Sequence, residues 1–275
     1  MWLQSNLIQD LGGGLLERLL IRAASAVEEL SLSLHKNADT LRLIRETRSQ
    51  RKWLLTSNEA FVLHSIACAQ SKQPGAIAEV GVFEGGSARM ICESKGDTPL
   101  HLFDTFAGLP PACEHDATVH RAKPHLYACS MESVQSYLQP FPNVYYHKGI
   151  FPQSVTNVPQ DLQFSFAHFD VDLYESTLCC LNYFYPRMRP GGVILSHDYS
   201  ILSGVRKAFS EFLDDKPEAL IELPTTQCMF VRSFPALSPN AVHLSGNRSA
   251  GVAPANGNGN GNGQDVRAPY LSERN

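Results

Sequence analysis

The chain has 275 residues, of which 43% are hydrophobic and 18% are charged, so it can bury one sizeable core in a single domain with extensions. A formal net charge of -4 provides no basic surface of the kind that binds a phosphate backbone, and we expect no nucleic-acid partner. The seven cysteines include no C-x-x-C pair and no zinc-ligand spacing, which predicts reduced thiols in an intracellular protein.

Residues from about 14 to 70 are expected to be helical, with Thr40 and Ser57 as N-caps. The first helix has apolar residues at helical spacing between Leu15 and Leu30, and this face needs a partner, either its own domain or a second subunit in a homodimer. The N-terminus lacks the unbroken apolar centre of a secretory signal, and no segment approaches the roughly 20 apolar residues of a membrane span. We therefore expect a cytoplasmic protein.

Short apolar runs follow the Pro74-Gly75 turn, each separated from the next by enough chain for a crossover helix. They cover residues 76–80, 100–103, 144–147, 164–169 and 192–196. This alternation predicts an α/β fold with a Rossmann-like, doubly wound and mostly parallel sheet. The final runs, 219–223 and 228–232, predict a closing antiparallel hairpin, an ending typical of methyltransferases.

The composition divides the chain into three parts. We expect an N-terminal helical extension over residues 1–73 and a methyltransferase domain over residues 74–234. The Asn/Gly-rich sequence over residues 235–275 cannot bury enough apolar surface to order itself, so we expect a disordered tail.

A glycine-rich turn joins the first predicted strand to a helix. Glycines let the backbone approach a ligand closely, and the first amides of the helix favour a carboxylate such as that of a methionine moiety. The spacing departs from the dinucleotide fingerprint, and Asp104 ends the next strand, where it can accept from both ribose hydroxyls. The pattern predicts an S-adenosylmethionine site formed by Glu79, Gly81, Gly85, Gly86, Ser87 and Asp104.

Acidic residues follow the next two strands of the predicted sheet. Parallel pairing would place Asp170 beside His197 and Asp198, a group that can hold Mg²⁺ or, because of the imidazole, Mn²⁺ or another transition metal. A bound cation lowers the pKa of an acceptor hydroxyl, and a nearby carboxylate removes its proton. Structural roles are the alternative for two neighbours, with Asp172 capping the following helix and His168 lying in the core.

These motifs resemble the macrocin O-methyltransferase family, which methylates deoxysugar hydroxyls on macrolide antibiotics. The resemblance covers about residues 54 to 232 and rests on EVGVFEGGSA (79–88), LHLFDTFAGLPP (100–111), HKGIFPQSV (147–155), AHFDVDLYEST (167–177) and RPGGVILSHDYS (189–200). It implies a metal held by Asp170, His197 and Asp198, with Asp170 also a candidate base. His197 departs from the family pattern, which has aspartate there, and the change removes one negative charge.

The expected function is therefore metal-assisted O-methylation of a hydroxyl on a small molecule, a sugar or a glycosylated natural product. Three alternatives stay open: a metal-independent methyltransferase with His197 or His168 as base, a nicotinamide-dependent oxidoreductase, and a non-catalytic binding module. Residues 113–130, which contain His115, His120 and His125, form either a solvated loop or a substrate lid.

Overall fold

The computed structural model of the protein describes residues 15–116 and 125–234. The helices are α2 (Leu15–Ser33), α3 (Ala38–Gln50), α4 (Ser57–Gln70), α5 (Gly86–Lys95), α7 (Met131–Leu138), α8 (Tyr174–Phe184) and α9 (Ser203–Leu213), with short 3-10 turns η2 (Gln153–Asn157) and η3 (Tyr185–Arg187). The strands are β1 (Ala76–Val80), β2 (Leu100–Asp104), β3 (Val144–Lys148), β4 (Phe164–Phe169), β5 (Met188–Ser196), β6 (Ile221–Glu222) and β7 (Cys228–Val231).

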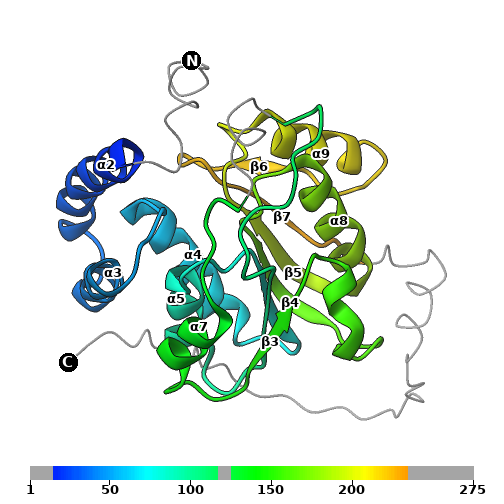
Figure 1. Ribbon diagram of the computed structural model, residues 1–275, viewed down its shortest axis with the longest axis horizontal. Coiled ribbons are helices and arrows are strands. Elements are labelled where there is room, and N and C mark those ends of the chain that lie inside the picture. The colour runs from blue at the N-terminus through cyan, green and yellow to red at the C-terminus, as the bar shows by residue number, and fades with distance from the viewer. Residues whose placement is uncertain (1–14, 117–124, 235–275) are drawn as a thin grey trace, which may run out of the picture. The chain divides into compact units, whose positions relative to one another are not determined.

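A seven-stranded sheet in the order β3-β2-β1-β4-β5-β7-β6 forms the centre of the fold (Figure 1). The strands from β3 to β5 run parallel, and β7 pairs antiparallel with both β5 and β6. The predicted fold class is confirmed, including the closing hairpin. The fifth strand begins earlier than predicted, at Met188, and contains Gly191 with a φ of 80°.

Helices cover both faces of the sheet (Figure 1), because its parallel strands carry apolar side chains on both faces. On one face α3, α4, α5 and α7 contribute side chains such as Ile44, Leu63 and Ile91 to a cluster with Ile77 of β1. On the other, α8 and α9 bury Phe184 and Phe209 against the strands. Burying one such side chain contributes about 1.5–3 kcal/mol, so the two clusters hold the strand ends in fixed register.

The helices α3 and α4 begin with side-chain caps that differ from the predicted ones. Asn37 caps α3, and Thr56 caps α4 in a reciprocal capping box with Glu59. The predicted caps Thr40 and Ser57 are wrong, because each lies inside the helix that it was expected to begin. Both positions have capping residue types nearby, and sequence alone does not decide which of them takes the extended conformation that a cap needs.

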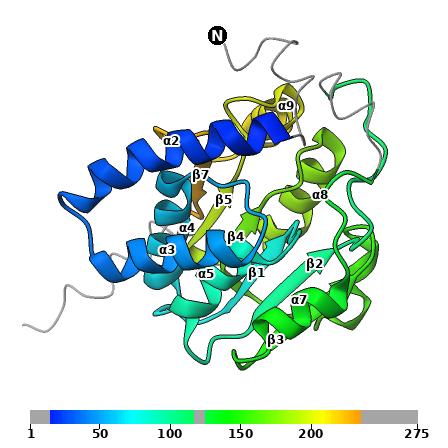
Figure 2. The same cartoon turned by 60° about the vertical axis from the view of Figure 1, so that its left-hand side comes forward.

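The first two helices pack outside α4, so that α2 lies across the end of the domain (Figure 2). Glu29 of α2 accepts hydrogen bonds from Arg45 (2.8 Å) and Arg48 (2.7 Å) of α3. Glu28 accepts from the backbone amide of Asn58 in α4 at 2.8 Å. These contacts fix α2 against the start of α4, which bears on the site described below.

Some expectations concern the whole chain. Between residues 15 and 234, apart from 117–124, no helix has both the length and the apolar content that a membrane crossing needs. All seven cysteines are free thiols. The tail expected over residues 235–275 lies outside the described residues.

Candidate active site

A cavity of about 670 Å³ lies at the carboxyl ends of the parallel strands. Its walls come from the turns that follow β1, β2, β3, β4 and β5, from α2, and from the chain that leads into α4. The first strand has β2 on one side and β4 on the other, so the connections leave it in opposite directions. Ligands of open α/β sheets bind at such a switch point, which marks this cavity as the candidate site.

The glycine turn forms one wall of the cavity. Gly81 has a φ of 87°, and a Cβ added there would lie 2.7 Å from the carbonyl carbon of Asp170. Only glycine allows the turns after β1 and β4 to approach this closely. Gly85 then starts α5 with a φ of 83° and no side-chain cap, so the first amides of the helix are left for a ligand. Gly86 and Ser87 line the same wall.

Asp104 braces this turn from the end of β2. Its carboxylate accepts from the amides of Val82 (2.6 Å), Phe83 (3.0 Å) and Phe106 (2.6 Å). The Thr105 hydroxyl lies 3.5 Å from Oδ1, but its one proton has a shorter bond of 2.6 Å to the carbonyl oxygen of Gly108. An ionised carboxylate offers about four acceptor positions, so about one is left for a further donor. The contact with both ribose hydroxyls stays a prediction, and the bracing of the turn is a second role that the sequence did not suggest.

Glu79 and His168 lie apart from the other predicted residues. Both are fully buried between β1 and β4, with Glu79 Oε1 2.9 Å from His168 Nδ1, and neither lines the cavity. Burial raises the pKa of Glu79 and outweighs the opposing effect of His168. The core location expected for His168 as an alternative is therefore found, whereas its role as a base for a substrate in the cavity is wrong.

Asp170, His197 and Asp198 meet at the end of β4 and β5, as the parallel pairing predicted. Phe169 and Ser196 are register partners, so the residues after them are neighbours. His197 Nδ1 lies 3.3 Å from Asp170 Oδ1 and 3.1 Å from Asp198 Oδ2. One donor atom from each of the three side chains lies within 4.8 Å of the others, which is compact enough for a single cation.

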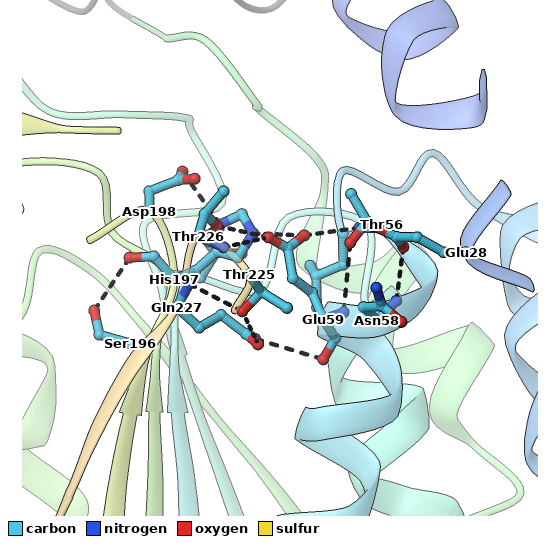
Figure 3. Close-up of polar contacts among 12 residues, drawn as sticks. Glu28, Thr56, Asn58, Glu59, Ser196, His197, Asp198, Thr225, Thr226 and Gln227 are labelled. Atoms are coloured by element: carbon cyan, nitrogen blue, oxygen red, sulfur yellow. Dashed lines mark hydrogen bonds and ion pairs between the residues drawn. The ribbon is translucent and has the colours of Figure 1, made fainter. Parts of the chain in front are cut away.

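Glu59 is a member of this cluster that the sequence did not reveal. It projects from the first turn of α4, and its Oε2 lies 3.3 Å from His197 Nε2 (Figure 3). The two aspartates lie near the other ring nitrogen, Nδ1. The sequence placed it only near the start of a helix, where it forms the capping box with Thr56. Contact with His197 depends on the packing of α4 against β4 and β5.

Burial and charge act in opposite directions on these groups. Burial would raise the pKa of Asp170 and of Glu59, but His197 lowers the first and holds the second at about 2. Burial would lower the pKa of His197, but Asp198, Asp170 and Glu59 raise it well above its ordinary value. A cluster of three carboxylates thus demands a positive charge at its centre.

The donor set fits a divalent cation. Both buried ring nitrogens of His197 lack an aligned hydrogen-bond partner; Nδ1 has two carboxylate oxygens at ion-pair distance and Nε2 has one. Nitrogen and carboxylate oxygen together suit Mn²⁺ and similar ions, and the oxygens alone suit Mg²⁺. A neutral imidazole with its other nitrogen turned to a carboxylate is the usual arrangement of a metal-ligating histidine.

The loop after β2 covers part of the cavity with its two stems. Leu109 and Leu126 are joined by a backbone hydrogen bond of 2.9 Å, and Gly108, Leu109 and Tyr127 line the cavity. The stems of the expected substrate lid therefore stand over the site. His120 belongs to the part of this segment that lies outside the described residues.

The helix α8 is capped by this loop rather than by Asp172. Asp116 is buried, and its Oδ1 accepts from the backbone amide of Tyr174 at 2.7 Å. Gly204 of α9 permits the approach, because a Cβ there would collide with the same oxygen. The capping role considered for Asp172 is wrong. Asp172 instead lines the cavity, with a φ of 60°.

Comparisons with known proteins place the chain beside natural-product methyltransferases. Residues 62–230 match the family model described as Macrocin-O-methyltransferase (TylF). The 8-demethyl-8-(2,3-dimethoxy-alpha-L-rhamnosyl)-tetracenomycin-C 4'-O-methyltransferase of Streptomyces olivaceus is 29% identical over 143 residues, which cover 46% of this chain and 54% of the relative. The demethyldecarbamoylnovobiocin O-methyltransferase of Streptomyces niveus is 27% identical over 154 residues, which cover 50% of this chain and 58% of the relative.

A solved structure shares the fold. The O-methyltransferase NovP aligns with a TM-score of 0.58 at 22% identity, over 66% of this chain and 82% of that one. The match with the curated relatives is shorter, since it spans little more than half of their length.

Proposed function

The chain belongs to the macrocin O-methyltransferase family, and on this premise we propose that it transfers the methyl group of S-adenosylmethionine to a sugar hydroxyl of a small glycosylated molecule. One observation carries the proposal: a single cavity joins the glycine turn at one end to the acidic cluster at the other. The relative from Streptomyces olivaceus is named for 4'-O-methylation of a rhamnosyl tetracenomycin, which supports a glycosylated acceptor.

The cofactor is proposed to lie along the turn after β1. The uncapped first amides of α5 would bind its carboxylate, Gly81 would allow the close approach, and the remaining acceptor position of Asp104 would take a ribose hydroxyl. Glu79 does not line the cavity, so its proposed contribution to cofactor binding is indirect, through Ser87, which lines the cavity and lowers the pKa of Glu79 by a side-chain hydrogen bond.

Asp170, His197 and Asp198 are proposed to hold a divalent cation, Mg²⁺ or Mn²⁺. Such an ion, when bound, lowers the pKa of the acceptor hydroxyl. Asp170 stays ionised because His197 outweighs the effect of its burial, so its carboxylate can accept the hydroxyl proton. The oxygen then forms a bond to the methyl carbon as the bond from that carbon to the sulfonium sulfur breaks, which leaves a neutral thioether.

A metal-independent reaction with His197 as base is the rival to this mechanism. Both ring nitrogens of His197 face carboxylates, and these raise its pKa well above the ordinary value. An imidazolium cannot accept a proton, so without a metal the residue is a poor base. The geometry weighs in favour of His197 as a ligand.

The outer face of α2 is proposed to pair with the same helix of a second copy. Val27 and Leu30 of α2, and Leu34 just after its end, follow the spacing of a helix-pairing seam and are 72%, 69% and 82% exposed. Neighbouring Ala26 and Ser31 are small and uncharged, so two copies would meet without repulsion. Sedimentation of the wild type and of Leu30→Glu tests this: the variant should shift a dimer to a monomer, and a monomeric wild type would refute it.

Calorimetry against S-adenosylmethionine tests the cofactor, and absence of binding would refute the proposed function. A mass-spectrometric screen of glycosides for the gain of one methyl group tests the reaction. Asp170→Asn should lose activity and keep cofactor binding. Asp161→Asn, an exposed acid ahead of β4, is the matched control and should keep both.

A further inference from the structure

Glu59 is held more rigidly than its place on a helix end requires. Its Oε1 accepts from the backbone amide (3.1 Å) and the hydroxyl (2.6 Å) of Thr226, and its Oε2 accepts from the amide of Thr56 at 2.8 Å. Glu59 is 2% exposed, and its carboxylate is stable in this buried position only because hydrogen-bond donors and the positively charged ring of His197 surround it. Its direction toward His197 is therefore fixed before any ligand arrives.

We infer that Glu59, which itself lines the cavity, is a positioning residue for the metal site and acts through His197. An imidazole can ligate through one nitrogen only if that nitrogen carries no proton. A cation held by Asp170 and Asp198 would meet Nδ1, the ring nitrogen that faces both aspartates, and Glu59 at 3.3 Å from Nε2 would then accept the remaining ring proton. The inference rests on the proposed function, since it assigns Glu59 a role in metal binding.

Charge gives Glu59 a second contribution. A neutral His197 brings no charge to the site, so Asp170 and Asp198 alone supply two negative charges to a divalent ion. The carboxylate of Glu59 behind the ring makes the ligating nitrogen more electron-rich and adds a third negative charge to the cluster. Truncating this support should therefore weaken the cation without removing a ligand.

The same residue joins three parts of the chain at the site. Glu59 lies on α4, Thr226 lies in the turn between β6 and β7, and His197 follows β5 (Figure 3). The turn is fixed in its own right, because the amide of Ser200 donates to the carbonyl oxygen of Thr226 at 3.0 Å. The helix start and the edge hairpin thus act together on the ring.

The test is Mn²⁺ binding to the full-length protein, followed by electron paramagnetic resonance of the free ion. Glu59→Gln should weaken Mn²⁺ binding by about 10 to 100-fold, the usual effect of losing such a partner. Glu218→Gln is the matched control: it also removes a buried carboxylate, one bonded to Tyr185 and to the amide of Ser233, but outside the cavity lining. This variant should lose thermal stability and keep Mn²⁺ affinity.

A double-mutant cycle separates positioning from simple support of the fold. With His197→Asp there is no ring to orient and only the charge of Glu59 is lost, so adding Glu59→Gln should weaken Mn²⁺ binding clearly less than it does in the wild-type background. An equal loss in both backgrounds would overturn the inference, as would Glu59→Gln binding Mn²⁺ like the wild type. If the wild-type protein binds no Mn²⁺, the inference fails together with the metal part of the proposed function. If the wild type binds Mn²⁺ and Glu59→Gln binds it equally well, the inference fails alone.

Discussion

Replacing Gly81 by alanine tests the close approach on which the cavity depends. The new Cβ would lie 2.7 Å from the Asp170 carbonyl carbon, whereas ordinary van der Waals contact is 3.4–4 Å. The Cβ would also overlap the carbonyl oxygen of Asp170, so the two turns must separate by about an ångström or more, which costs about 1–3 kcal/mol as overpacking. The φ of 87° adds about 1–2 kcal/mol of backbone strain for an alanine. We expect a total loss of about 2–5 kcal/mol in the free energy of unfolding.

Gly96→Ala is the matched control for this experiment. Gly96 also has a positive φ, 55°, but a Cβ there would meet no atom within 4 Å. Gly96→Ala should lower the free energy of unfolding only by the backbone strain, and it should leave S-adenosylmethionine binding in calorimetry unchanged. Chemical denaturation measures both losses. If Gly81→Ala unfolds at the same denaturant concentration as Gly96→Ala and binds the cofactor normally, the close approach has no functional weight.

Three further predictions concern the brace, the metal and the pH dependence. Asp104→Asn replaces one acceptor of the amides of Val82 and Phe83 by a donor, so S-adenosylmethionine affinity in calorimetry should fall by more than about 10-fold; unchanged affinity would contradict the bracing role. Treatment with a chelator should abolish product formation, and Mg²⁺ or Mn²⁺ should restore it; full activity in the chelator would contradict the proposed metal. His101 and His147 pack with their ring nitrogens 3.0 Å apart, and burial, then His147, lowers the pKa of His101 to about 4 from 6.5. Between pH about 4 and about 6.5 the unfolded chain therefore binds more protons than the folded protein, so the free energy of unfolding should rise as the pH increases through this range. His101→Phe should flatten that rise, as measured by urea titrations at several pH values. An unchanged slope in the variant would show that other groups cause the pH dependence.

The sheet and the cluster were predictable because each depends on a short stretch of sequence. The runs at β1 and β4 are continuous and apolar, and both strands were located to the residue. Parallel order then places Asp170 beside His197 without further information, since residues that follow paired strands are neighbours.

Residues whose partners come from distant elements were not predictable. Glu59 meets His197 only after α4 has packed across the sheet, and Asp116 reaches the amide of Tyr174 across a loop. In each case the sequence favoured a local explanation, an N-cap at Ser57 for α4 and a helix cap from Asp172 for α8. Local rules describe which groups need a partner, and tertiary packing decides which partner they find.

The domain boundary predicted between residues 73 and 74 separates residues that belong to the same site. That position marks the start of the sheet, but Leu20 and Ile21 of α2 line the cavity and Glu59 of α4 faces the acidic cluster. The ring of Trp53 lies about as close to Gly86 as a side chain can, since an added Cβ would stand 3.1 Å from it, so the chain before α4 also shapes the start of α5. A domain beginning at residue 74 would contain the predicted ligands and lack the groups that orient and enclose them. We therefore propose that the functional unit begins with α2, and that the helical extension is a wall of the site.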